Sequence, residues 1–553
     1  MALVNMDWFM RTATLLLATI SCSYSTFVRA GDTLPARSDY EFVIARQEVT
    51  LAPGLRQNKT VVNGQFPGPQ MRVPYGSHVR NKVTNMIPSN GSSIHWHGLI
   101  NNGTPWFDGF ASQNQCGIPT NQSFLYQYET KLQSGTAWWH AHFADENVDG
   151  VFGPLIVEDE PGGFPYDYDE DWTILMTDSY NKTSWELIDY LKMPEEPENP
   201  HTDPSPDLGF ACLYDSFNAA ACSHDSTGQG LTLNFEQGKT YRLRLIGAAN
   251  LVPFLFSIDG HEMRLAKSDL TTLDGQSTVN SLFIFSGQRY DVLVTARSDV
   301  QDGESFWLRS TMINCGRGPS GVLNGDLRGV VQYGSTSTIK PPTSTPWNDT
   351  STVCAGPPLS MLTPRVNNFI DSNPAITLMI NYTIIFDPVT QYLIATVNDQ
   401  SYSTPPTAYP TLFQYHADPN WTPDSGRNVL VVGDQYRGKQ VRVLLISIAA
   451  IGAHPFHLHG HDFHVLASGT GVYNDSVPLN LANPPRRDTT SVPAGGYTVV
   501  QFTADNPGVW AFHCHIGWHL EEGMLAQLVE LPQAISEMRI PPEAIDQCGE
   551  QDV

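Results

Sequence analysis

Hydrophobic residues along most of this chain either alternate with polar residues or form short runs between Gly, Pro and Asn turns. Residues 40–44, 240–245 and 291–294 are examples of such segments. A period of two, or a short apolar run bounded by turns, is typical of the strands of β-sandwiches. The stretch 441–451 is also expected to be a buried strand, because it is too short to cross a membrane. The pattern therefore predicts an all-β protein built from sandwiches.

Two Pro-rich, polar stretches, at residues 158–165 and 335–358, interrupt this pattern. A chain of 553 residues is longer than one hydrophobic core normally serves. We therefore expect three domains, at residues 31–160, 166–335 and 355–553. Residues 1–30 contain Arg11, an apolar run and a small-x-small site at 28–30, which together predict a secretory signal peptide.

The composition favours export and argues against some partners. A formal net charge of −25 disfavours a nucleic-acid partner, because phosphate binding needs clustered Lys and Arg. No later apolar run approaches the length of a membrane-spanning helix. We expect a secreted monomer, extracellular or in the cell wall, that does not insert into membranes. Nine glycosylation sequons support export: Asn58, Asn90, Asn102, Asn121, Asn181, Asn348, Asn381, Asn420 and Asn474.

Ten of the seventeen histidines lie in four short clusters. On a strand, residues i and i+2 point to the same face, so each His-x-His pair sends two imidazoles into one space. A single histidine is usually an ordinary core or surface residue, but many neutral imidazoles packed together leave ring nitrogens unsatisfied unless a metal binds them. The clusters are His95 and His97; His140 and His142; His454, His457 and His459; and His513, His515 and His519.

Copper is the metal that this ligand set favours. Cys514 with His454 and His519 forms a set of one thiolate and two imidazoles, and Met524 follows where a weak axial thioether ligand could lie. Zinc fits less well, because its catalytic sites need only three protein ligands and its structural sites carry more thiolates. His513 and His515 flank Cys514 and should point away from it, so one tripeptide would join a thiolate site to an imidazole cluster.

The four clusters resemble the copper signatures of the multicopper oxidases, and their surroundings resemble those of fungal laccases. The similar segments are residues 62–69, 93–98 and 114–116, and the likeness covers about residues 40 to 548. The resemblance implies three consecutive cupredoxin-like Greek-key β-sandwich domains. It also implies four copper ions: one type 1, one type 2 and two type 3. The first and third domains would hold the ligands, while the second would be structural and shape the substrate surface.

The same resemblance assigns each ligand a role. His454, Cys514 and His519 would bind the type 1 copper, with Met524 axial. His95 and His457 would bind the type 2 copper. The two type 3 coppers would be held by His97, His140 and His515, and by His142, His459 and His513.

Asp108 matches a family carboxylate that assists proton delivery during dioxygen reduction; the alternative is that an aspartate before Gly109 is a turn residue. The other histidines, including His461 and His464, are expected to be structural. Among fifteen possible pairings of six cysteines, the resemblance favours Cys116–Cys548, Cys212–Cys222 and Cys315–Cys354.

The predicted activity is that of a laccase: one-electron oxidation of phenolic donors coupled to reduction of dioxygen to water. Many fungal laccases have Leu or Phe where this chain has Met524, which predicts a lower type 1 potential and favours phenol coupling in pigment or secondary-metabolite biosynthesis. Other donors remain open, namely ascorbate, bilirubin-like compounds or a metal ion, for which Asp215 and Asp225 are candidate carboxylates. A non-catalytic copper-binding cell-wall protein is the alternative from another class.

Overall fold

The computed structural model describes residues 37–52, 54–88, 91–194, 203–214, 219–315, 325–334, 340–348, 354–449 and 452–550. The signal peptide expected at residues 1–30, the sequon at Asn90, and the residues His201 and Asp215 lie outside this part. The elements below all belong to one compact unit that begins at Ala36. Strands dominate this unit, and the all-β prediction is confirmed.

The first sandwich is formed by two four-stranded sheets. Strand β1 pairs in parallel with β4 and antiparallel with β2. Burial alternates along β4 and β6, so one face of this sheet packs inward, as the period-two pattern predicts. In spatial order, the first sheet contains β2 (Leu55–Val62), β1 (Arg37–Ala52), β4 (His78–Asn85) and β6 (Ser123–Glu129), and the second contains β3 (Met71–Val73), β8 (Phe152–Val157), β7 (Gly135–Ala141) and β5 (Ile94–His97).

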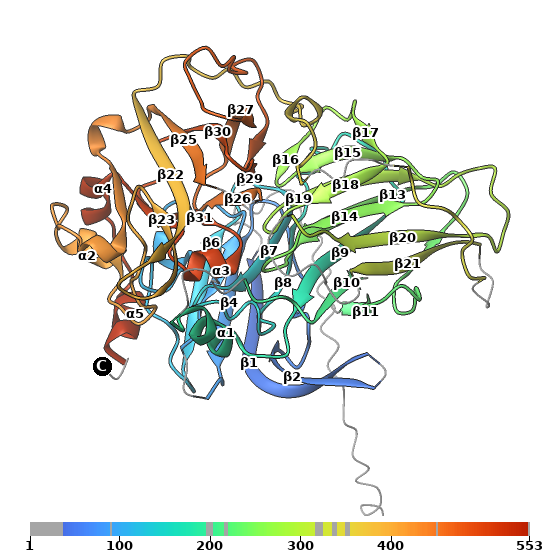
Figure 1. The fold of residues 1–553 in the computed structure, drawn as a ribbon, viewed down its shortest axis with the longest axis horizontal. Coiled ribbons are helices and arrows are strands. Elements are labelled where there is room, and N and C mark those ends of the chain that lie inside the picture. Colours follow the sequence, from blue (N-terminus) through green and yellow to red (C-terminus); the bar gives the residue numbers. More distant parts are fainter. Residues whose placement is uncertain are drawn as a thin grey trace, which may run out of the picture. The chain divides into compact units, whose positions relative to one another are not determined.

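The second sandwich follows, drawn in green in Figure 1. Helix α1 (Ser184–Leu191) leads away from strand β9 and begins at a capping box, in which Thr183 and Glu186 satisfy each other's backbone N–H groups. One sheet contains β11 (Ala219–Ser223), β10 (Leu208–Tyr214), β9 (Glu170–Ser179), β13 (Thr240–Gly247), β19 (Arg289–Thr295), β15 (Met263–Ser268), β16 (Thr271–Thr272) and β17 (Thr278–Val279). The other contains β12 (Thr232–Phe235), β21 (Asp326–Tyr333), β20 (Ser305–Met312), β14 (Phe254–Ile258) and β18 (Ser281–Ile284).

The third sandwich, orange to red in Figure 1, has a six-stranded and a five-stranded sheet. The first contains β23 (Tyr392–Val397), β22 (Ile376–Asp387), β25 (Gln440–Ala449), β30 (Gly496–Thr503), β27 (Phe463–Thr470) and β28 (Arg486–Arg487). The second contains β24 (Val429–Val432), β32 (Leu525–Glu530), β31 (Gly508–Cys514), β26 (His454–Leu458) and β29 (Thr489–Val492). Four short helices accompany them: α2 (Thr411–Ala417), α3 (Gly517–Glu521), α4 (Pro532–Ser536) and α5 (Pro542–Asp546). Among the described residues, no helix is long and apolar enough to span a membrane.

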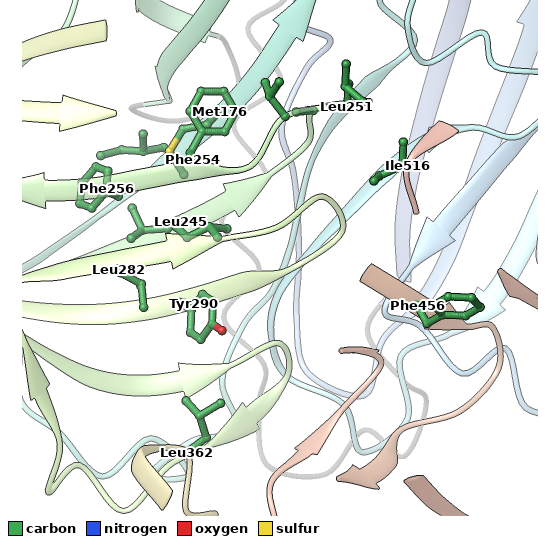
Figure 2. Close-up of a cluster of buried hydrophobic side chains, with 14 of the residues drawn as sticks. Met176, Leu245, Leu251, Phe254, Phe256, Leu282, Tyr290, Leu362, Phe456 and Ile516 are labelled. Atoms are coloured by element: carbon green, nitrogen blue, oxygen red, sulfur yellow. The ribbon is translucent and has the colours of Figure 1, made fainter. Parts of the chain in front are cut away.

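The apolar cores of the second and third sandwiches form one continuous cluster of buried side chains. Figure 2 shows part of it, with Phe254 and Leu245 of the second sandwich and with Ile516 and Phe456 of the third. Burial of this surface removes apolar area from water across the boundary between the two domains, which stabilises their association. The cluster thereby fixes the loop after strand β13 against the segment that follows Cys514.

Buried ion pairs join the same two sandwiches close to the histidine clusters. Arg289 of β19 donates to Asp488 over 2.6 Å, and Arg487 of β28 donates to Asp269 over 2.9 Å. Each pair satisfies charges that would be costly to bury alone. Asp488 is held in place by these contacts at the position where it meets two histidines of the candidate site.

Three disulfides are present, and they pair as the resemblance implied: Cys116–Cys548, Cys212–Cys222 and Cys315–Cys354. Cys514, the remaining cysteine of the described residues, is not part of a disulfide and is buried. The prediction of three domains is confirmed, while the domain limits at residues 31–160, 166–335 and 355–553 stay predictions.

Candidate metal centres

Strand pairing brings the four histidine clusters together. Strand β5 pairs with β7 so that His95 lies opposite His140, and strand β26 pairs with β31 so that His457 lies opposite His513. Side chains two residues apart on each strand share a face, so each His-x-His pair points in one direction. Both pairs of strands aim their imidazoles at a common point between the first and third sandwiches.

Eight imidazoles meet at this point, all of them buried. His95 Nε2 lies 3.4 Å from His457 Nε2, His97 Nδ1 lies 3.2 Å from His515 Nε2, and His459 Nε2 lies 3.1 Å from His513 Nε2. His140 and His142 complete the group: His140 groups with His95 and His97, and His142 with His459 and His513.

The outward nitrogens of several of these rings are anchored by hydrogen bonds. Nδ1 of His95 donates to the carbonyl of Asp108 over 2.8 Å, and Nδ1 of His457 donates to the carbonyl of Asp488 over 2.9 Å. Nδ1 of His513 donates likewise to the carbonyl of Cys514 over 2.9 Å. A ring that donates from Nδ1 keeps a lone pair on Nε2, which is the form that binds a metal.

The ring nitrogens that face the centre of the cluster are suited to bind copper ions. The Nε2 atoms of His140 and His142 are buried, and no described residue forms a hydrogen bond with them. Burial, followed by repulsion from neighbouring imidazoles, lowers the pKa of His97, His140, His142, His457, His459 and His515 well below the usual value. Burial likewise lowers the pKa of His513 to about 4. Neutral rings with unsatisfied lone pairs are costly in an interior, and metal ions resolve this cost.

A second constellation lies at the end of strand β31. Cys514 Sγ lies 3.6 Å from His454 Nδ1 and 3.6 Å from His519 Nδ1, and all three side chains are buried. Met524 is fully buried, and its carbonyl accepts a hydrogen bond from the backbone N–H of Cys514 over 3.1 Å. A thiolate with two imidazoles is the main donor set of a blue-copper site, and the backbone contact places Met524 beside it in the fold.

Asp108 is not a simple turn residue. One carboxylate oxygen lies 2.7 Å from His459 Nδ1, and the other lies 3.4 Å from His95 Nδ1. Asn101 also donates to this carboxylate over 3.2 Å. Asp108 therefore touches two rings of the eight-histidine cluster while it is itself buried.

The structure adds three contacts that the sequence analysis missed, and all come from residues near the histidines only in space. The carboxylate of Asp203 lies 3.3 Å from Nε2 of His519. The carboxylate of Asp488 lies 3.2 Å from Nε2 of His97. Ser286 Oγ lies 2.9 Å from Nδ1 of His515. No local sequence pattern identifies these residues, so only the three-dimensional structure reveals them. The middle domain thus supplies Asp203 and Ser286 directly to histidines.

A small cavity opens beside His454. Its walls are mostly apolar, and none of the described residues that line it is acidic. Asp178 does not line the cavity but supports one of its walls. Its carboxylate accepts hydrogen bonds from the backbone N–H groups of Asn250 and Leu251 over 2.7 and 2.8 Å. Principal lining residues are Leu251, Val252, Phe285, Ile313 and Ile516. Asp225, considered above as a carboxylate for a metal-ion donor, instead accepts from Thr227 in a turn and does not line this cavity.

Several of the remaining histidines hold ordinary structural contacts. His261 bonds to Tyr333 over 2.6 Å, and His416 donates to the carbonyl of Ile535 over 3.1 Å. His461 lies 2.9 Å from Glu530, and this carboxylate raises the pKa of the ring although burial lowers it.

Known proteins resemble this chain over most of its length. Three family models described as multicopper oxidase match residues 43–162, 170–335 and 400–534. The chain is 32% identical to Laccase-1 of Botryotinia fuckeliana over 521 residues, which cover 94% of this chain and 86% of that protein. The crystal structure of laccase from Botrytis aclada superposes with a TM-score of 0.81 at 28% identity and covers 93% and 92% of the two chains. Fet3p, a multicopper oxidase that functions in iron import, superposes with a TM-score of 0.80 at 26% identity and covers 93% and 94%.

Proposed function

Because the chain belongs to the multicopper oxidase family, we propose that it is a laccase-type enzyme that oxidises phenolic donors by one electron at a time and reduces dioxygen to water. When bound, a type 1 copper would accept single electrons from the donor, and a cluster of three coppers would pass four of them to dioxygen. The residues of the chain would hold these ions and direct the electrons and protons.

Each ligand keeps the role that the resemblance implies. His454, Cys514 and His519 would hold the type 1 copper, with Met524 as a further, weaker donor. His95 and His457 would hold the type 2 copper. His97, His140 and His515 would hold one type 3 copper, and His142, His459 and His513 the other, in accord with the distances between these rings. The backbone of residues 513–515 would connect the two sites covalently.

Asp108 would deliver protons to the cluster from its position against His459 and His95. His513, Cys514 and His515 would carry the electrons between the two sites. Asp488 and Ser286 would orient His97 and His515.

The observation that carries the choice of donor is the apolar, uncharged cavity beside His454. A phenol is a small aromatic molecule with one polar group, and apolar walls with few polar atoms favour such a ligand. Ascorbate carries charge and several hydroxyl groups, and it finds no charged partner among the described lining residues.

A specific observation supports one second candidate, oxidation of a metal ion. Asp203 places a carboxylate against the outer nitrogen of His519, and an acidic residue at this position could attract a cation. The same carboxylate is 9% exposed and already engaged with the ring, so little of it faces a donor. We therefore rank this candidate below the phenol oxidase.

Oxygen uptake by the copper-loaded protein separates these candidates. We expect a strong absorption band at about 600 nm from a thiolate-bound copper. We also expect the fastest oxygen uptake with a methoxyphenol. Faster uptake with ferrous iron, abolished in Asp203→Ala, would instead establish the second candidate. Ascorbate and bilirubin should be compared in parallel, and copper binding without oxygen uptake on any donor would indicate a non-catalytic copper-binding protein.

The biological setting follows from the same chemistry. One-electron oxidation releases phenoxyl radicals that couple, so we propose a role in pigment or secondary-metabolite biosynthesis. We also propose that the protein is secreted and glycosylated and acts as a monomer. Seven of the eight acceptor asparagines in the described residues are exposed, and Asn381 is half-buried, which supports the proposal of glycosylation.

A further inference from the structure

The chain covers only part of the outer face of the six-stranded sheet in the third sandwich. A segment that includes Tyr473 and Leu481 packs on this face against Leu466 of strand β27 and Val499 of strand β30. Leu444 of strand β25 belongs to the same buried cluster. Strand β22 is the next strand in the sheet, and none of its described residues belongs to this cluster. The cover therefore ends at strand β25.

Strand β22 carries exposed apolar side chains on this outer face. Ile380 and Tyr382 are buried in the core of the sandwich, so the odd-numbered residues beside them point outward. Met379 is 49% exposed and Ile385 is 45% exposed. Ile448 of strand β25, where the register with β22 shifts, is 58% exposed. We call Met379, Ile385 and Ile448 the apolar strip. The solvent face of a sheet is normally polar, so apolar side chains that gather there usually meet a partner.

An acceptor for N-linked glycosylation lies within the apolar strip. The sequon occupies residues 381–383 of strand β22. Asn381 follows Met379 by two residues and precedes Ile385 by four, so the three side chains share one face. Its register partner on strand β25 is Ile446, and neighbouring strands lie about 5 Å apart. The side chain of Asn381 therefore leaves the sheet between the apolar residues of two strands.

We propose that an N-linked glycan on Asn381 covers the apolar strip and shields it from water and from other molecules. The ring carbons and acetyl groups of the first sugars would pack on the strip, while their hydroxyl groups face water. A lipid-pyrophosphate-linked oligosaccharide would donate the glycan during export. A bond forms between the amide nitrogen and the first sugar carbon, the bond from that carbon to the pyrophosphate breaks, and the amide loses one proton. This inference rests on the proposed secretion and glycosylation.

Two observations favour a glycan over a second copy of this chain as the occupant. Each copy carries a formal net charge of −25, so two copies repel each other. A stable interface buries about 800 Å² on each partner, and a few side chains on two neighbouring strands offer much less. A glycan needs no such area, because its covalent bond holds it at the strip. The sequon thus supplies an occupant of suitable size at the site itself.

The test uses full-length protein secreted from a host that glycosylates. Thr383→Val removes the sequon and leaves Asn381 in place, whereas Thr383→Ser keeps the sequon. We expect mass spectrometry of glycopeptides to find a glycan on Asn381 in wild type and in Thr383→Ser, and none in Thr383→Val. The Thr383→Val protein should bind more of a hydrophobic dye. It should also precipitate at a lower concentration near its isoelectric point, where repulsion between copies vanishes. Thr383→Ser should match wild type in both measurements.

Two further variants separate the effect of this glycan from general effects of glycan loss. Asn420→Gln removes a sequon in an exposed turn, where the backbone N–H of Asn420 donates to Asp418. We expect it to lose one glycan and to keep wild-type dye binding. Met379→Thr with Ile385→Thr makes the apolar strip more polar while keeping residues that suit a strand. Added to Thr383→Val, this pair should return dye binding towards the wild-type level.

Several outcomes would overturn the proposal. The first is an unmodified Asn381 in wild type, and a dimer of unmodified protein would assign the strip to a second copy instead. The second is wild-type dye binding in Thr383→Val. If Thr383→Val is not secreted, wild type can be treated after folding with a glycosidase that removes N-linked glycans. Treatment should then raise dye binding in wild type but not in Met379→Thr with Ile385→Thr, and an equal response in both would overturn the proposal.

These measurements do not depend on turnover. Oxygen uptake per copper should be equal in all the variants, because none of the altered residues lies in the candidate metal centres. Absence of oxygen uptake on every donor would contradict the proposed activity and leave the glycan result intact. Absence of glycans from every sequon would contradict the proposed glycosylation as a whole, whereas their absence from Asn381 alone would contradict only this inference.

Discussion

Asp203 and His519 are joined across two domains, with the carboxylate of Asp203 3.3 Å from the outer nitrogen of His519 while the inner nitrogen faces Cys514 at 3.6 Å. A carboxylate that accepts this N–H raises the electron donation of the ring to a bound metal. Oxidised copper carries more charge than reduced copper and gains more from this donation. The contact therefore links a loop of the second domain to the redox behaviour of the third.

Replacement of Asp203 by Asn should raise the type 1 potential. We expect a rise of roughly 60 mV, the equivalent of a tenfold change for one electron, measured by redox titration of the blue band. Asp207→Asn is the matched control, since this carboxylate accepts the backbone N–H of Asn181 at the surface and does not contact His519. An unchanged potential in Asp203→Asn would mean that this carboxylate does not tune the site.

Met524→Leu should also raise the potential. Met524 is fully buried, so Leu fills nearly the same volume and the fold should tolerate the exchange. Loss of the thioether would remove a weak donor that favours oxidised copper. The same titration measures the effect, and a potential equal to wild type would show that the sulfur atom does not act on the metal.

Asp108→Asn should slow dioxygen reduction while leaving electron uptake intact. Its carboxylate touches His459 at 2.7 Å, so it can move protons at the cluster, and loss of such a group typically costs about a hundredfold or more. Anaerobic reduction of the blue band by a phenol should proceed at the wild-type rate, whereas reoxidation should be slow. Slow reduction with normal reoxidation would place Asp108 outside the proton path.

The sequence predicts most of the fold and the candidate ligands, but not what surrounds them. Residues 40–44 and 291–294 lie in strands β1 and β19, as their patterns predict, because alternation and turn residues are local signals. The ten histidines and Cys514 stand out because His-x-His spacing is also local.

Asp203 and Asp488 could not be predicted, since an isolated aspartate carries no pattern. Their approach to histidines depends on the packing of the three domains. The same limit applies to the two acidic residues that the sequence suggested as carboxylates for a metal-ion donor. Asp225 lies in an ordinary Asx turn with Thr227, and Asp215 lies outside the described residues.

His464 should make the protein less stable in acid. Burial, followed by the charge of Arg486, lowers the pKa of this ring from 6.5 to about 4. The unfolded chain therefore binds a proton below pH 6.5 that the folded protein does not bind until about pH 4. The stability contributed by the neutral ring is complete above pH 6.5 and is lost as the pH falls through this window, by about 3 kcal/mol.

His464→Gln removes this titration, so its melting temperature should fall less than that of wild type between neutral pH and pH 4. His416→Gln serves as the control, because the ring of His416 donates to the carbonyl of Ile535 and is a comparable partly buried histidine. Parallel melting curves for wild type and His464→Gln across this pH range would contradict the prediction.

The disulfide between Cys116 and Cys548 should contribute more stability than that between Cys212 and Cys222. The first closes a loop with a sequence separation of 432 and ties the first domain to the end of the third, whereas the second closes a hairpin with a separation of 10. A crosslink restricts the unfolded chain more as the loop grows, with typical gains of about 2–4 kcal/mol. Cys116→Ser with Cys548→Ser should therefore lower the melting temperature more than Cys212→Ser with Cys222→Ser. An equal loss in both would indicate that strand pairing and packing in the folded state, rather than loop closure, set the contribution of these crosslinks.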